Sequence, residues 1–308
     1  AHNIAIRKIG VQKNLKINEY GVFKKDERIA GKKETDVFAQ VDLPYIEPEL
    51  REYRGEIEAA REGRLPQLIS LEDIRGDLQS HTRETDGHAS LEEMFDAAAA
   101  LGYEYLAITD HSQNVSMAKG MDARRLAKQI EAIEALNEKR DDLRILKGCE
   151  VDILKDGSLD LPDDILQQLD LTVCSIHYNR NLSRDQQTRR VLRAMENPNF
   201  KIFGHPTGRI LNERPPYEID LERIMKAARE NGCILELNAH PDHLDISDTQ
   251  CKMARDMGVM LAISTDAHRP DELQFMRCGI EQARRGWLEA ENVINTRSWK
   301  ALRKLLER

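Results

Sequence analysis

The sequence predicts an α/β protein in which repeated βα units build either a barrel or a doubly wound parallel sheet. From about residue 70 onward, short apolar runs alternate with segments of helical periodicity. A chain of 308 residues is also long enough for one large α/β domain with a smaller companion. The seven β-like runs are 73–79, 103–109, 143–149, 171–176, 201–204, 233–238 and 259–265.

The region before the first of these strands differs from the rest in composition. Residues 1–33 hold nine Lys or Arg and three acidic residues, which gives a local charge of +6. Pro44, Pro48 and Pro66 and the charge-dense run 49–66 follow, a composition typical of a linker with a short surface helix. We therefore expect a domain boundary near residue 70.

Helices are expected between the strands. In 90–102, Ser90 and Glu93 form a capping box, apolar residues recur three or four positions apart, and Gly102 provides a C-terminal stop. The segments 122–136, 220–232 and 296–306 repeat this pattern of a polar start and an apolar stripe. Such helices would cover the sheet.

Composition excludes several classes of protein. With 40% hydrophobic and 32% charged residues, the chain is typical of a folded domain rather than a disordered one. No apolar stretch approaches the roughly 20 residues of a membrane span, and the start lacks a signal-peptide core, so we expect a cytoplasmic protein without a membrane partner. Five cysteines without a C-x-x-C motif indicate reduced thiols. The net charge of −8 argues against a uniformly basic nucleic-acid-binding surface.

Metal-competent side chains follow six of the seven expected strands. In a barrel, the C-terminal ends of parallel strands meet at one end, where chemistry takes place. Mixed imidazole and carboxylate ligands favour Zn²⁺, Mn²⁺ or Fe²⁺ over Mg²⁺ or Ca²⁺, and so many ligands imply a cluster of two or three ions. The side chains at the strand ends are Gln79, His81, His111, Glu150, His177, His205, Asp266 and His268.

Several of these segments resemble the successive motifs of the PHP (polymerase and histidinol phosphatase) domain. They are DLQSHTRETDGHAS, ITDHS, GCEVDI, SIHYNRNLS, FGHPTGR and ISTDAH. The strings GHPTGRIL, ERPPYEID and ELNAHPDHLDI are most similar to the PHP domain of bacterial and archaeal family X DNA polymerases, and HNIAIRKIGVQKNLKINEYGVF resembles the tail of the polymerase thumb. The resemblance implies a thumb remnant over 1–45, a linker over 46–72 and a PHP domain over 73–308, without the preceding polymerase domains.

The resemblance implies a distorted TIM-like (β/α)7 barrel of PHP type, preceded by a small α+β thumb remnant. It also implies two to three divalent ions, Mn²⁺ or Zn²⁺, and a hydrolase acting on DNA 3′ ends in gapped or single-stranded DNA during repair. The expected activities are 3′–5′ exonuclease, 3′-phosphatase and 3′-phosphodiesterase. Glu150 would bridge two ions, and Glu150, His111 and Asp266 would be catalytic. The implied ligands are His81, Asp86, His111, Glu150, His177, His205, Asp266 and His268.

One position departs from the family pattern. Gln79 stands where the H-x-H motif of the family has its first histidine, so one ion would have a weak amide ligand instead of an imidazole. Such a change is expected to reduce or abolish activity, because losing a ligand or its support typically costs about 10–100-fold in affinity or rate.

Other residues near the motifs have weaker claims. Arg209, Arg214 and Arg180 are candidates for gripping a phosphate, or are surface charges. Asp110 would orient an imidazole or stabilise a turn. We favour Asp86 over His88 as a ligand. His240 and His243 are minor candidates for metal ligation, and no role is expected for His2.

Two alternatives to the DNA 3′-end hydrolase remain open at this point. One is a small-molecule phosphatase of the histidinol-phosphate type, against which the thumb-like segment argues. The other is a metal-poor barrel, impaired by Gln79, that has a structural or DNA-positioning role.

Overall fold

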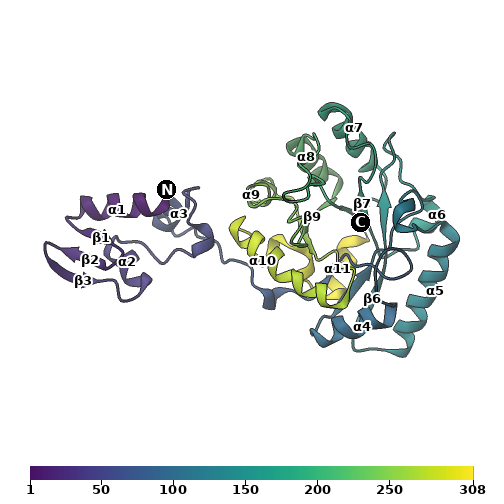
Figure 1. Cartoon of the computed structure of the whole chain (residues 1–308), viewed down its shortest axis with the longest axis horizontal. Helices are drawn as coiled ribbons and strands as arrows, with labels where there is room; N and C mark the ends of the chain where they lie inside the picture. Colours follow the sequence, from purple (N-terminus) through teal and green to yellow (C-terminus); the bar gives the residue numbers. More distant parts are fainter. Residues whose placement is uncertain (308) are drawn as a thin grey trace. The chain divides into compact units, whose positions relative to one another are not determined.

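The computed structural model describes residues 1–307 and divides the chain into two compact units. The first is Ala1–Gln67, and the second begins at Leu68 and extends to the C-terminal part of the chain (Figure 1). Among the described residues, no helix combines the length and apolar character that crossing a bilayer requires.

The first unit is a small α+β fold, as expected from the sequence. Helix α1 (His2–Gln12) precedes an antiparallel sheet in the order β1-β2-β3. The remaining elements of this unit are β1 (Lys16–Asn18), β2 (Gly21–Lys24), β3 (Glu27–Ala30), α2 (Glu34–Gln40) and α3 (Glu56–Arg61).

The segment after α2 packs into this first unit. Ile46 and Ile57 are buried. Glu56, the first residue of α3, is also buried and lies 2.7 Å from Nδ1 of His2. Its carboxylate accepts further hydrogen bonds from the backbone amides of Tyr53 and Arg54. His2, for which the sequence suggested no role, therefore ties the start of the chain to α3.

The second unit is built on a sheet whose neighbouring strands are all parallel and follow one another in sequence order. Beyond the strands, the amide of His81 donates to the carbonyl of Ala267 (2.8 Å), and that of Asp266 donates to Gln79 (3.1 Å). These bonds join the two edges, so the barrel is nearly closed, and the expected TIM-like (β/α)7 architecture is confirmed. In the described residues its strands are β4 (Gly76–Asp77), β5 (Tyr105–Ile108), β6 (Arg144–Asp152), β7 (Leu171–Ser175), β8 (Ile202–Phe203), β9 (Ile234–Asn238) and β10 (Leu261–Ser264).

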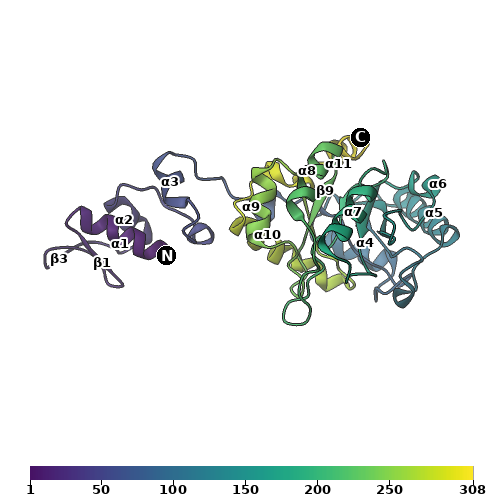
Figure 2. The ribbon, with the colours of Figure 1, turned by 90° about the horizontal axis from the view of Figure 1, so that it is seen from above.

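Helices surround this sheet (Figures 1 and 2). Their apolar faces pack on the strands in one continuous core, in which Phe95 and Met225 are fully buried. The helices within residues 68–307 are α4 (Leu91–Ala100), α5 (Ala123–Lys139), α6 (Asp163–Leu166), α7 (Arg184–Ala194), α8 (Leu221–Asn231), α9 (Asp248–Asp256), α10 (Met276–Arg285) and α11 (Trp299–Leu306).

A second apolar cluster closes the barrel at the N-terminal ends of its strands. Leu302 and Leu306 of α11 belong to the same cluster as the first residues of β5 and β7, Tyr105 and Leu171. The hydroxyl of Tyr105 also donates to the carbonyl of Arg297, just before α11 (3.0 Å). Because this end is filled by apolar side chains, polar chemistry is confined to the opposite, C-terminal end of the strands.

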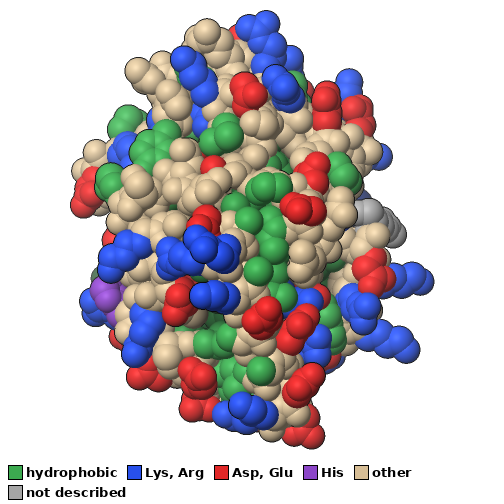
Figure 3. Space-filling model, turned by 90° about the vertical axis from the view of Figure 1, so that its right-hand side faces the viewer, with side chains coloured by type: hydrophobic (Ala, Val, Ile, Leu, Met, Phe, Trp, Pro, Cys, Tyr) green, Lys and Arg blue, Asp and Glu red, His purple; other side chains and the backbone are tan. Residues whose placement is uncertain are grey.

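The outer surface of the second unit shows no dominant charge on the face drawn in Figure 3. Lys and Arg side chains are interspersed there with Asp and Glu. This mixture agrees with the sequence-based exclusion of a uniformly basic coat.

Candidate metal centre

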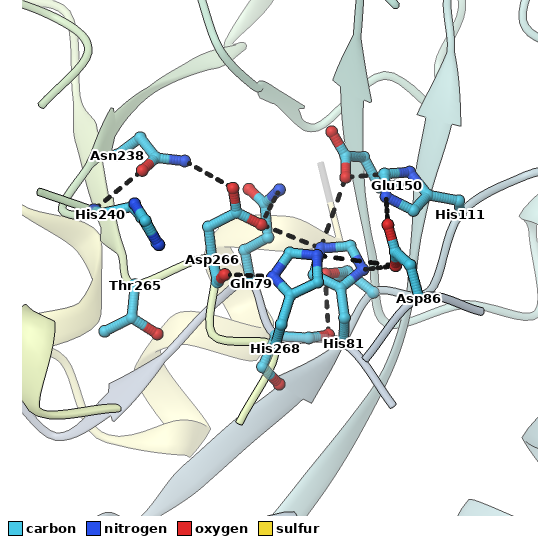
Figure 4. Close-up of polar contacts among 12 residues, drawn as sticks. Gln79, His81, Asp86, His111, Glu150, Asn238, His240, Thr265, Asp266 and His268 are labelled. Carbon is cyan, nitrogen blue, oxygen red and sulfur yellow. Dashed lines mark hydrogen bonds and ion pairs between the residues drawn. The ribbon is translucent and has the colours of Figure 1, made fainter. Parts of the chain in front are cut away.

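The side chains predicted from the strand ends meet at the C-terminal end of the barrel (Figure 4). Glu150 is still within β6, whereas His177 and His205 follow β7 and β8 within two residues. All-parallel pairing directs every strand toward the same end, so residues nearly 190 positions apart become neighbours. The structure thus brings all nine predicted metal ligands, Gln79 included, into one region.

Glu150 lies at the centre of this group. Its Oε2 is 3.5 Å from Nε2 of His81 and 3.3 Å from Nδ1 of His111. Its Oε1 is 3.3 Å from Nε2 of His177 and 3.5 Å from Nε2 of His205. Burial opposes ionisation of Glu150, but the neighbouring imidazoles hold its pKa well below the usual range. One fully buried carboxylate therefore faces four imidazoles.

Asp86 completes a second part of the site. Its carboxylate oxygens lie 3.2 Å from Nε2 of His111 and 3.6 Å from Nε2 of His268. Burial alone would raise the pKa of Asp86, yet its contacts with His111 and His268 lower it far below normal. The alternative, His88, is exposed and belongs to none of the metal-competent groups in residues 1–307.

Asp266 defines a third part, beside Gln79. Oδ1 of Asp266 is 3.0 Å from Nε2 of His81 and accepts from the Gln79 amide (3.4 Å), while Oδ2 is 3.4 Å from Nε2 of His205. Burial lowers the pKa of His205 to about 4 despite the nearby carboxylates, so its imidazole is neutral, as a metal ligand must be. His205 and Asp266 both have positive φ (44° and 55°), a strained conformation that only a well-determined site sustains.

The donor atoms fit divalent metal ions. Both ring nitrogens of His81, Nδ1 of His111 and both oxygens of Glu150 are buried without a hydrogen-bond partner. Buried polar atoms are normally paired, so a missing partner requires an explanation, and nitrogen–oxygen sets of this kind suit Zn²⁺ or Mn²⁺. The donor groups with ligand atoms within 4.8 Å of one another are His81/Asp86/His111/His268, His111/Glu150/His177, His81/Glu150/Asp266 and His205/His243/Asp266.

Sequence reasoning missed the residues that orient the predicted ligands. Asp152 accepts from the amide of His177 (3.0 Å), and its Oδ1 lies 3.1 Å from the Nδ1 of the same ring. Asn238 donates to Oδ2 of Asp266 (3.2 Å). Asp152 could have been found, because it lies two residues after Glu150 in the same strand and shares its face.

Of the two roles that the sequence suggested for Asp110, the structure agrees with the stabilisation of a turn. Its carboxylate accepts from the amide and hydroxyl of Thr82, from the hydroxyl of Thr85 and from the Gln129 side chain. Within the described residues these are its side-chain partners, so Asp110 holds the loop that carries Asp86 rather than orienting an imidazole.

The three arginines predicted to bind phosphate are placed unequally. Arg209 donates to the carbonyls of His243 and Leu244, which commits its guanidinium to the loop. Arg214 and Arg180 each donate through Nε to a backbone carbonyl (2.9 and 3.3 Å). Burial and the positive charge of Arg214 lower the pKa of Arg180, and the carboxylate of Glu150 acts in the opposite direction. Arg180 thus lies within the electrostatic reach of the metal-competent cluster.

The chain matches two family models. Residues 1–52 match the DNA polymerase beta thumb, and residues 77–240 match the PHP domain.

Curated and solved proteins give a consistent comparison. The DNA polymerase/3′-5′ exonuclease PolX of Bacillus subtilis (strain 168) is 41% identical over the whole of this chain, which spans about half (54%) of that relative. A "probable phosphatase" of Thermoanaerobacter sp. (strain X514) is 29% identical over 71% of this chain and 90% of its own. A crystal structure of a "putative histidinol phosphatase" from Listeria monocytogenes superposes with a TM-score of 0.51 at 17% identity, covering 64% of this chain and 97% of that one. This last likeness concerns the fold alone.

Proposed function

The chain belongs to the PHP domain family, in the form in which the PHP domain follows the thumb of a family X DNA polymerase, and on this premise we propose that it is a metal-dependent phosphoesterase acting on DNA 3′ ends. The proposed reactions are 3′–5′ exonuclease, 3′-phosphatase and 3′-phosphodiesterase on gapped or single-stranded DNA. The proposed partners are DNA and the polymerase domains that precede a thumb in this family.

The observation that carries the proposal is the position of Glu150, whose two unpaired, buried oxygens face four imidazoles. A buried carboxylate without hydrogen-bond donors is costly unless it is matched by positive charge. Two to three divalent ions, Mn²⁺ or Zn²⁺, would supply this charge, neutralise a bound phosphate and acidify a water molecule. The proposed ligands are His81, Asp86, His111, Glu150, His177, His205, Asp266 and His268, with Gln79 as a weak one.

The chain's own residues would then position the reactants. Glu150, His111, Asp266 and His81 each belong to two of the donor groups, so they line the space between them. We assign the catalytic roles to Glu150, His111 and Asp266. Asp152 fixes the ring of His177 through its Nδ1. Arg180 and Arg214 are the proposed contacts for the DNA phosphate. The charge of Glu150 acts on Arg180, and Arg214 lies close enough to Arg180 to act on it in turn.

Turnover by the full chain tests this proposal. We expect the metal-loaded protein to shorten or dephosphorylate a labelled oligonucleotide faster than it hydrolyses histidinol phosphate. Glu150→Gln should lower the rate at least about tenfold, since the loss of a ligand typically costs 10–100-fold. His88→Ala, a change of an exposed histidine at the same end of the barrel, should leave the rate unchanged.

Two results would contradict the proposal. Preference for histidinol phosphate would favour the small-molecule phosphatase. Metal-loaded protein that hydrolyses neither substrate would favour a structural or DNA-positioning barrel.

A further inference from the structure

Gln79 offers only an amide to the part of the site where the family pattern has an imidazole. The side chain is fully buried, and its Nε2 donates to Oδ1 of Asp266 at 3.4 Å. The opposite amide orientation would set the Gln79 oxygen against a carboxylate oxygen, which is repulsive, so the donor must face Asp266. Gln79 therefore uses its amide nitrogen on Asp266. Its Oε1 is buried without a hydrogen-bond partner in the described residues and is a weaker ligand than an imidazole. A metal ion next to Asp266 would therefore be held more tightly by an imidazole supplied from elsewhere.

His243 lies beside His205, whose Nε2 is 3.4 Å from the other oxygen of the same carboxylate, Oδ2 of Asp266. Its ring is 5.1 Å from the ring of His205, centre to centre. A nitrogen of each of these histidines and an oxygen of Asp266 lie within 4.8 Å of one another. Nδ1 of His243 is 2.9 Å from the carbonyl oxygen of Arg209. A carbonyl can only accept, so Nδ1 carries the proton and Nε2 keeps its lone pair, which is the arrangement that prepares a histidine for a metal.

The loop that carries His243 is held against the loop that carries His205. Arg209 donates to the carbonyls of His243 (3.0 Å) and Leu244. In return, Asp245 accepts from the amides of Thr207 (2.9 Å) and Gly208 (2.8 Å). These contacts cross-link 205–209 to 243–245, so the two imidazoles are fixed relative to each other. Arg209 acts here as a positioning residue.

We propose that His243 supplies the imidazole that position 79 lacks, so that His205, His243 and Asp266 together hold one of the divalent ions. The inference rests on the proposed metal-dependent function and deepens it. If it is correct, the missing imidazole at position 79 is replaced by that of His243. The chain should then bind as many metal ions as a relative that has the first motif histidine.

Zinc binding tests this inference without an activity assay. The full chain is stripped with a chelator, titrated with Zn²⁺ against a chromophoric competitor, and its bound metal is counted by atomic absorption. We expect His243→Asn to lose one equivalent of tightly bound Zn²⁺, or to bind it at least tenfold more weakly. The Asn amide can still donate to the Arg209 carbonyl, so the loop contact is preserved while Nε2 is removed. His88→Ala is the matched control and should bind like the unchanged protein.

A double-mutant cycle with position 79 sharpens the test. In the His243→Asn background, Gln79→His should restore the lost equivalent, because it supplies an imidazole next to Asp266. In the unchanged background, the same substitution should alter the affinity for this ion less than threefold. Fluorescence of Trp287 and Trp299, both in the second unit, reports whether each variant is folded.

The outcomes separate the two proposals. If the unchanged chain binds Zn²⁺ but His243→Asn binds the same number of ions with the same affinity, the role of His243 is refuted and the metal-dependent function stands. If the unchanged chain binds no Zn²⁺ or Mn²⁺, both are refuted. A tenfold gain in Zn²⁺ affinity from Gln79→His in the unchanged background would also refute the proposed role of His243. It would show that His243 does not make up for the missing imidazole at position 79.

Discussion

Asp110 shows how a buried residue outside the metal-competent set supports the site. It accepts from the amide and hydroxyl of Thr82, the hydroxyl of Thr85 and the amide of Gln129. Asp110→Ala would leave buried donors without partners, each worth about 1–3 kcal/mol. We expect the free energy of unfolding of the second unit to fall by about 3 kcal/mol, measured by urea titration of tryptophan fluorescence in the presence of a chelator.

The matched control for Asp110 is Asp141→Ala. Asp141 is exposed on the same unit, and an exposed substitution of this kind changes stability by less than about 0.5 kcal/mol. Equal stability of Asp110→Ala and Asp141→Ala would show that the network around Asp110 does not hold the loop of Asp86.

At the residue scale, the sequence predicts which side chains meet at the C-terminal ends of the strands, because strand direction determines this. Glu150 and His177 could be placed in one site because parallel strands end together. The positioning role of Arg209 and the partners of Asp110 could not, because they depend on contacts between separate loops: Arg209 with the carbonyl of His243, and Asp110 with Thr82. Neither contact follows from the periodicity of a helix or a strand.

At the element scale, the start of helix α4 agrees in detail with the prediction from the sequence. The Ser90 hydroxyl accepts from the amide of Glu93 (3.2 Å), and the Glu93 carboxylate accepts from the amide of Ser90 (2.6 Å), which is the predicted capping box. Ser90→Ala should lower the free energy of unfolding by about 1 kcal/mol, whereas Ser90→Gly should cost only a few tenths, because glycine is itself tolerated at a cap. The measurement is the urea midpoint of tryptophan fluorescence. Identical midpoints for the two variants would contradict a capping role.

The segment 49–66 of the first unit shows why the packing of an expected helix can escape prediction. Residues 49–66 are dense in charge, and this pattern suggested a linker with a short surface helix. The structure buries Leu50 and Ile57 there and pairs Glu56 with His2, 54 positions earlier. A charged residue looks solvated in a sequence whenever its partner is remote, so the packing of α3 could not be read from local composition.

At the scale of the whole molecule, we expect the second unit to bind the metal ions and the first unit to contribute to DNA affinity. Leu68 and Ile69 are tied to the second unit, since Leu68 pairs with Glu289 and the amide of Ile69 donates to the carbonyl of Leu288 (3.0 Å). A fragment over 68–308 should therefore fold by itself and bind as much Zn²⁺ as the full chain. All proposed ligands lie in this fragment, so metal content should not depend on the first unit. A lower metal count in the fragment would contradict this independence.

DNA affinity should respond in the opposite way to the same truncation. All nine Lys and Arg of residues 1–33 are exposed, so the positive charge of the first unit is available to a phosphate backbone. Each phosphate contact releases counterions, which makes binding weaken steeply with salt, with a slope of about 0.7 per contact for single strands. Without residues 1–67, we expect single-stranded DNA to bind at least about tenfold more weakly at low salt and with a shallower slope, measured by fluorescence anisotropy between low and physiological salt. An equal affinity and slope for the fragment and the full chain would mean that DNA is held by the barrel alone, through Arg180, Arg214 and the bound ions.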